Sequence, residues 1–149
     1  MKENWSDVSI MKDVVDACYE VYRTLGRCFV EKAYKIALAQ ELRFRGYKDI
    51  LVEEWIDIDY KGAPIEKAFK ADIIVDHQLI VELKAVPELT TAHHSQLQSY
   101  MLFADIPYGL LVNFHANLLK DNISRKSLAE IKSYQNLPSL RSWRGKIKH

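Results

Sequence analysis

Two acidic residues and a lysine occur in this chain at a spacing that could bring their side chains together. Asp72 precedes Glu82 by ten residues, and Lys84 follows Glu82 by two. The residues between the acids are mostly aliphatic except for a polar break at 76–78, which is typical of two strands joined by a short loop. A three-residue loop centred on His77 places Asp72 opposite Glu82. Because side chains alternate along a strand, Lys84 shares the face of Glu82.

This cluster has the composition of a site for a hard divalent cation. Magnesium prefers oxygen ligands, and the backbone carbonyl of Leu83 could join the carboxylates of Asp72 and Glu82. A cation held there could activate a water molecule and stabilise charge on a phosphate, and Lys84 could orient that water or neutralise the developing charge. These groups suit hydrolysis of a phosphodiester bond. The alternative interpretation is a surface hairpin with a Glu–Lys pair, which contributes little energy.

Further polar residues on expected helices could complete such a site. Gln96 and Tyr100 stand four residues apart after the hairpin, so they share a helix face, and His93 lies on the same side. Glu31 lies on a mostly apolar early helix, with Tyr34 one turn later, and could point toward the acids. The alternative is that these are ordinary residues of helix edges and surfaces.

The elements that must position these residues follow from periodicity and from the turn residues. Three- and four-residue steps of apolar residues predict two helices between about residues 6 and 46, separated at Gly26. Strands are expected at 50–60, 69–75, 79–86 and 108–114, with a helix from Thr90 or Thr91 to about Ala104 and a short helix in the tail. The first three strands can form an antiparallel meander, and the helix carries the chain over to the fourth. This order predicts an α/β fold with a mixed sheet flanked by helices.

Taken together, these residues resemble a nuclease signature. Asp72, Glu82-Leu83-Lys84 and Gln96-x-x-x-Tyr100 look like the motif of the PD-(D/E)XK nuclease superfamily, in its RecB-like branch with a QxxxY helix. The wider pattern is similar to the small bacterial GxxExxY proteins over roughly residues 10 to 125. The resemblance also rests on Leu25-Gly26, Glu31, Tyr34, Ala37-Leu38, Glu41-Leu42-Arg43, Arg45-Gly46, Tyr60-Lys61-Gly62, His93 and residues 109–114. One position departs from the pattern, since Cys28 replaces the glycine three residues before Glu31.

The resemblance implies a restriction-endonuclease-like αβββαβ core with a mixed four-stranded sheet. It implies Asp72 and Glu82 as ligands of Mg²⁺ or Mn²⁺, Lys84 as the catalytic lysine and Glu31 as an additional acid. It also implies that Gln96 and Tyr100 shape the site, with His93 and Tyr34 in supporting positions. An iron–sulfur cluster of the kind found in some relatives is not expected, because the chain has only two cysteines, Cys18 and Cys28, which we interpret as free thiols.

Charge is distributed unevenly along the 149 residues. The net charge is +1, but from Lys120 onward eight basic and two acidic residues give +6, so the first 119 residues carry −5. We therefore expect a single domain over 1–125 and a basic tail over 126–149 that contacts nucleic acid through Lys126, Arg141, Arg144 and Lys146. The alternative is a solvated tail without a partner.

Three functions remain open from the sequence. The first is a metal-dependent nuclease acting on DNA, or less favourably on RNA. The second is a nucleic-acid-binding module of the same fold that does not cut. The third is a protein-interaction subunit, for example a homodimer, in which Trp5, Trp55 and Trp143 act as anchors. The first residues do not resemble a signal peptide and no apolar run is long enough for a membrane span, so a cytoplasmic location is expected.

Overall fold

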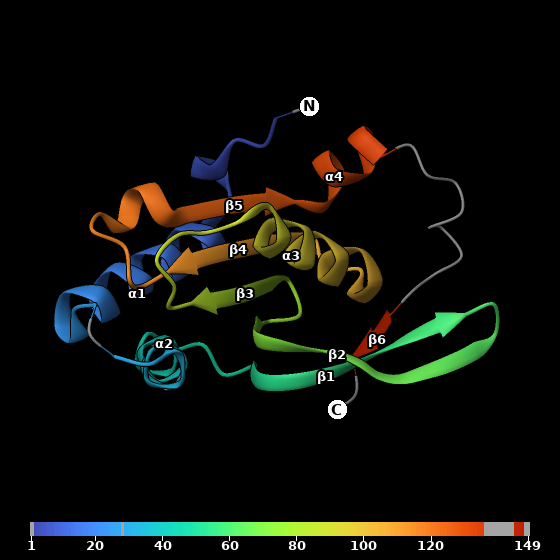
Figure 1. Cartoon of the computed structure of the whole chain (residues 1–149), viewed down its shortest axis with the longest axis horizontal. Helices are drawn as coiled ribbons and strands as arrows, with labels where there is room; N and C mark the ends of the chain where they lie inside the picture. The colour runs from blue at the N-terminus through green and yellow to red at the C-terminus, as the bar shows by residue number, and fades with distance from the viewer. Residues whose placement is uncertain (1, 28, 136–144, 148–149) are drawn as a thin grey trace.

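A mixed six-stranded sheet with helices on both faces organises the protein (Figure 1). The computed structural model describes residues 2–27, 29–135 and 145–147. In chain order the elements are η1 Trp5–Asp7, α1 Ser9–Leu25, α2 Glu31–Phe44, β1 Ile50–Tyr60, β2 Ala63–Val75, β3 Leu79–Lys84, α3 Thr91–Ala104, β4 Tyr108–Asn113, η2 Leu119–Asn122, β5 Ile123–Ser127, α4 Leu128–Gln135 and β6 Gly145–Ile147. No helix in these ranges is long and apolar enough to cross a bilayer.

The strand order confirms the predicted topology and adds to it. The strands lie in the order β5-β4-β3-β2-β1-β6. The antiparallel meander β1–β2–β3 is joined through α3 to β4, which runs parallel to β3. The sequence predicted these four strands. The structure adds β5 beside β4 and β6 beside β1, both antiparallel to their neighbours. The restriction-endonuclease-like core is therefore present within a wider sheet.

The β2–β3 hairpin has the predicted loop and register. Residues 76–78 form the loop, in which Asp76 and His77 adopt positive φ angles of 52° and 54°. Val75 pairs with Leu79, and the ladder continues only as far as the pair Ile73–Val81. Beyond that pair the two strands no longer follow a regular ladder, and Asp72 and Glu82 lie at the point where the strands separate.

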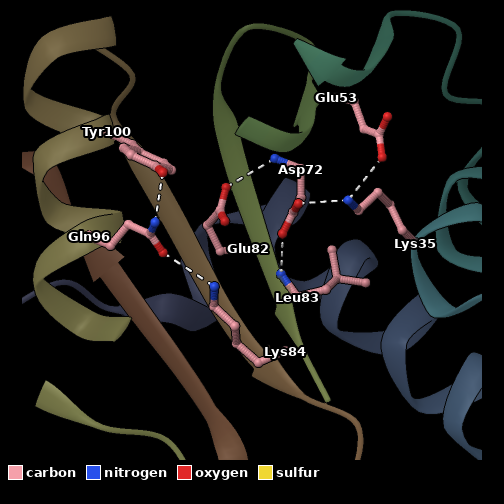
Figure 2. A network of polar contacts seen from close by, with 8 residues as sticks. All are labelled: Lys35, Glu53, Asp72, Glu82, Leu83, Lys84, Gln96 and Tyr100. Atoms are coloured by element: carbon pink, nitrogen blue, oxygen red, sulfur yellow. Dashed lines mark hydrogen bonds and ion pairs between the residues drawn. The ribbon is translucent and has the colours of Figure 1, made fainter. Parts of the chain in front are cut away.

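The core consists of two apolar layers, one on each face of the sheet. On one face α1 and α2 pack through residues such as Met11, Val14 and Leu38. On the other face α3 and α4 pack through Leu97 and Ile131, among others. These layers fix the positions of α2 and α3 relative to the β2–β3 hairpin (Figure 1), and Figure 2 shows Lys35 of α2 and Gln96 of α3 pointing toward it.

Helix α3 begins and packs in a way that fixes its rotation. Thr90 caps its N-terminus by accepting a hydrogen bond from the backbone N–H of His93, and the Nδ1 atom of His93 accepts one from the N–H of Thr90. At its centre the helix approaches β4 at Gly109, where an added Cβ atom would overlap the sulfur of Met101 and crowd Leu97. A larger residue there would force these two side chains to move, and the helix presents Gln96 and Tyr100 toward the hairpin (Figure 2).

The chain after residue 119 contributes more to the sheet than expected. Strand β5 spans the position at which we placed the end of the domain, and helix α4 follows it. The short helix predicted further along the tail, near Pro138, lies outside the described residues. Lys126 lies within β5, and the backbone of Lys146 pairs with β1 in β6. Arg141, Trp143 and Arg144 lie outside the described residues, so their predicted roles stay predictions.

Candidate active site

Asp72 and Glu82 lie where β2 and β3 separate, a place that we call the fork. Their side chains accept backbone hydrogen bonds there in place of the strand-to-strand bonds of a regular ladder. The backbone N–H of Asp72 donates to Oε1 of Glu82 at 3.0 Å, and the N–H of Leu83 donates to Oδ2 of Asp72 at 2.9 Å (Figure 2). Both acids are buried, with Asp72 8% and Glu82 3% exposed. Because each carboxylate satisfies a backbone donor of the neighbouring strand, the pair is held rigidly by the fold.

Burial makes this pair electrostatically unfavourable in the absence of a cation. Desolvation raises the pKa of Glu82 well above its ordinary value, and the carboxylate of Asp72 raises that pKa further. The hydrogen bond from the Asp72 N–H opposes this shift and lowers the pKa. The fork therefore favours positive charge, supplied by a proton or by a cation.

The raised pKa of Glu82 predicts how the stability of the metal-free protein depends on pH. Between the ordinary pKa of 4.5 and the higher folded value, the folded chain binds more protons than the unfolded chain, so stability falls as pH rises through that window. Glu82→Gln removes this loss. We expect the variant to melt at a higher temperature than wild type at about pH 8, by at least about 2 °C, and the difference to shrink toward about pH 4. Thermal melts in a chelator test this, and a difference independent of pH would contradict it.

Lys84 is oriented by two residues of α3. Its Nζ donates to Oε1 of Gln96 at 3.2 Å, and Nε2 of Gln96 donates to the hydroxyl of Tyr100 at 2.8 Å (Figure 2). Tyr100 stacks on Phe69 with ring centroids 4.0 Å apart. Burial and the nearby Glu82 carboxylate raise the pKa of Tyr100 to about 12, so its hydroxyl stays protonated. The structure thus places Lys84, Gln96 and Tyr100 in one hydrogen-bonded chain beside Glu82.

Glu31 reaches the same region from the first turn of α2. Its pKa is raised by burial and by the carboxylate of Asp72, and it is lowered by Lys84, Lys35 and His93. These influences indicate that Glu31 lies near the charged groups of the fork, and its role as an additional acid stays a prediction. His93 of α3 lies near Glu31, and its Nδ1 atom accepts the hydrogen bond from the N–H of Thr90 that caps the helix.

Tyr34 has a different position from the one expected for a site residue. It is fully buried, and its ring stacks on Phe114 at 4.6 Å. Its hydroxyl donates to the carbonyl of Gly26 at 2.7 Å and accepts from the N–H of Phe29 at 3.2 Å. Tyr34 therefore holds the connection between α1 and α2 together. Cys28, the departure from the GxxExxY pattern, lies in this connection but outside the described residues.

Two residues that contact the fork or the chain beside it were missed from the sequence. Lys35 is buried, and its Nζ lies 2.9 Å from Oδ1 of Asp72. Lys35 stands four residues after Glu31, among apolar residues of the same helix face, and this position indicates a buried lysine. Asn113 at the end of β4 is also buried and bonds both the N–H and the carbonyl of Val86, which fixes the chain just after Lys84. A single asparagine at a strand end carries no sequence signal of this role.

The donor set at the fork fits a hard divalent cation. Two carboxylates are present, and the backbone of Leu83 lies beside them, since its N–H donates to Asp72; we expect its carbonyl to be the third oxygen donor. Among the described residues, no three His, Cys, Asp or Glu side chains are grouped closely enough to hold a metal ion by themselves. Waters and substrate oxygens would therefore complete the shell, which is usual for magnesium.

The architecture and the fork together define the class of protein. An αβββαβ core with two acids between adjoining strands, followed by a lysine on the second strand, has the organisation of a restriction-endonuclease-like nuclease domain. The chain belongs to the PD-(D/E)XK nuclease superfamily, whose family model matches residues 8–126. No curated protein and no solved structure gives a significant match. The superfamily assignment is confirmed, and the narrower GxxExxY and QxxxY assignments stay predictions.

Proposed function

We propose that this protein is a metal-dependent nuclease that hydrolyses phosphodiester bonds of DNA, with RNA as a less favoured substrate. The observation that carries the proposal is the fork between β2 and β3, where two buried acids lie beside a lysine oriented by Gln96. Membership of a nuclease superfamily supports it.

The residues of the fork have distinct roles in this proposal. Asp72, Glu82 and the carbonyl of Leu83 would hold Mg²⁺ or Mn²⁺, which when bound would supply an activated water and a counter-charge for the phosphate. Lys84 would donate a hydrogen bond to the attacking water or to a phosphate oxygen. Gln96 and Tyr100 hold the lysine in place, and Glu31 accepts hydrogen bonds at the entrance to the fork.

The direct test is cleavage of single-stranded and double-stranded DNA, and of RNA, with each divalent cation and with a chelator. Calorimetric titration of Mn²⁺ into the protein is run in parallel. Metal-dependent cleavage supports the proposal. A protein that binds neither cation and leaves all substrates intact contradicts it.

One observation favours a second candidate, a nucleic-acid-binding module that does not cut. The ammonium of Lys35 already contacts Asp72, so the fork has a counter-charge of its own. In that case DNA binding would be sensitive to salt and unaffected by chelation, and no cation would bind at the fork.

Lys126 is the described residue that we propose as a nucleic-acid contact. Its Nζ lies 3.0 Å from Nδ1 of His94 and 3.4 Å from the hydroxyl of Ser124. Burial lowers the pKa of Lys126, and none of the described carboxylates forms an ion pair with it. It lines a hollow of about 210 Å³ between α3, β5 and α4, together with Arg125, Gln98, Ser127, Glu130, Ile131 and Tyr134. A phosphate would place a negative charge directly beside this ammonium.

Lys126→Ala is expected to weaken DNA binding about three- to tenfold and to reduce the salt dependence by about one released counterion. The measurement is fluorescence anisotropy in Ca²⁺ at several salt concentrations. Lys132→Ala is the matched control, because Lys132 is exposed on α4 and lies 3.7 Å from Asp105. Equal losses for both variants would refute a specific role of Lys126.

Two further assignments rest on the sequence. We propose a cytoplasmic location and a homodimer, with Trp55 as a candidate anchor because it is 40% exposed beside Lys70. Trp5 is less suited, because it packs edge-on against Tyr108 at 5.9 Å. Light scattering tests the assembly.

A further inference from the structure

Lys35 is a buried lysine shared by two acids that differ in exposure. It comes from α2 and is only 8% exposed. Its Nζ lies 2.9 Å from Oδ1 of Asp72 and 3.3 Å from Oε1 of Glu53 on β1 (Figure 2). The Asp72 side chain is 12% exposed and the Glu53 side chain 48%. The ammonium therefore lies between a buried acid of the fork and an acid at the surface.

The ammonium of Lys35 occupies the place beside Asp72 that a divalent cation bound by Asp72 would need. The other oxygen of Asp72, Oδ2, already accepts a hydrogen bond from the N–H of Leu83, whereas Oδ1 contacts the ammonium of Lys35, so a cation ligated through Oδ1 would compete directly with Lys35. Burial lowers the pKa of Lys35, but its contacts with Asp72 and Glu53 raise that pKa above the ordinary value, so the side chain carries its charge.

Glu53 is held where it can receive this ammonium. It lies on β1 between Val52 and Glu54, whose partners on β2 are the residues either side of Asp72. Its φ angle is 55°, a left-handed conformation that costs a non-glycine residue of the order of 1 kcal/mol or more and persists only where the surroundings enforce it. Because Nζ already contacts both carboxylates, a small rotation of the lysine side chain transfers it from one to the other.

We propose that Lys35 is a built-in counter-ion, which neutralises Asp72 in the metal-free protein and moves onto Glu53 when a divalent cation binds the fork. This inference rests on the proposed function, because it requires the fork to bind a metal. Lys35 is a positioning residue in this scheme, since it acts on the cation through Asp72. Lys35 thereby stabilises the metal-free fold but lowers the affinity for the cation. Glu53 makes this loss of affinity smaller, because it accepts the displaced ammonium.

The scheme predicts opposite effects for the two partners of the ion pair. Lys35→Met removes the competing charge, so Mn²⁺ is expected to bind at least about tenfold more tightly. Glu53→Gln removes the acceptor for the displaced ammonium, so Mn²⁺ is expected to bind about three- to tenfold more weakly. In the double variant the effect of Glu53→Gln should largely disappear, because no ammonium remains to be displaced. A purely structural role would weaken binding in both single variants.

The experiment is calorimetric titration of Mn²⁺ into wild type, both single variants and the double variant, with circular dichroism of each. Lys32→Met is the matched control for Lys35, because it removes one exposed positive charge from the same helix, and Glu66→Gln on β2 is the control for Glu53. If Lys35→Met does not fold, Glu53→Gln still tests the scheme, since Glu53 is half exposed.

The outcomes separate the two proposals. Tighter binding for Lys35→Met and weaker binding for Glu53→Gln, both beyond their controls, support the transfer of the ammonium. Equal affinities in all variants overturn the role of Lys35 and leave the proposed nuclease intact. Absence of Mn²⁺ binding in wild type and in every variant overturns both.

Discussion

Lys84→Ala and Glu82→Gln are each expected to reduce metal-dependent DNA cleavage by at least about 10³-fold. Lys84 is held beside Glu82 by Gln96 of α3, and its removal takes away the proposed donor to the attacking water or the phosphate. Glu82→Gln keeps the hydrogen bond from the Asp72 N–H but removes the negative charge that a cation requires. The measurement is single-turnover cleavage of a labelled DNA substrate at saturating Mn²⁺.

The two variants should lose activity in different ways. Lys84→Ala should retain Mn²⁺ binding, because the lysine is not a ligand, whereas Glu82→Gln should lose it. Lys48→Ala, an exposed lysine before β1, controls for the loss of a positive charge and should cleave like wild type. Equal cleavage by all four proteins would point to a contaminating nuclease and would end the proposal.

Tyr34→Ala is expected to destabilise the protein by about 3–5 kcal/mol, the usual cost of removing a buried aromatic ring. The ring is fully buried against Phe114, so its loss leaves a cavity between α2 and β4. Tyr34→Phe keeps the ring and loses the hydrogen bond to the carbonyl of Gly26, for an expected cost of about 1–2 kcal/mol. Denaturant unfolding measures both values.

Activity distinguishes this structural role from a catalytic one. The folded Tyr34→Phe protein should cleave DNA at the wild-type rate, because the hydroxyl bonds the α1–α2 connection and not the fork. Tyr134→Phe is the control for unfolding, since Tyr134 is 82% exposed and should change stability by less than about 0.5 kcal/mol. A loss of cleavage in Tyr34→Phe without a loss of stability would place this tyrosine in the reaction.

The hairpin at the centre of the site could be predicted from the sequence because local rules determine it. Strand alternation and a three-residue loop fix the register from Val75–Leu79 to Ile73–Val81 without knowledge of the rest of the fold. Gln96 and Tyr100 were predictable for the same reason, since helical spacing places them on one face.

Elements that depend on distant partners were missed. The first part of β2, from Ala63 to Ala68, is exposed and pairs only with the end of β1, so its sequence lacks the apolar alternation of a core strand. Pro64 there indicated a turn. Strand β5 has the sequence Ile-Ser-Arg-Lys-Ser and is a strand because β4 offers it a free edge. Lys35 was missed because its partners come from β1 and β2, far away along the chain.

The hydrogen bonds at the fork have a consequence for how relatives of this protein can diverge. The side-chain oxygens of Asp72 and Glu82 each accept a hydrogen bond from a backbone N–H, so a side chain without an acceptor would leave a buried donor without a partner even in a descendant that no longer cuts nucleic acid. Selection for folding alone would then preserve an acceptor oxygen at both positions, although not the negative charge. The ammonium of Lys84 contacts the side chain of Gln96, so losing this lysine leaves no buried backbone group without a partner. Among homologues that have lost catalysis, position 84 should therefore be substituted before positions 72 and 82.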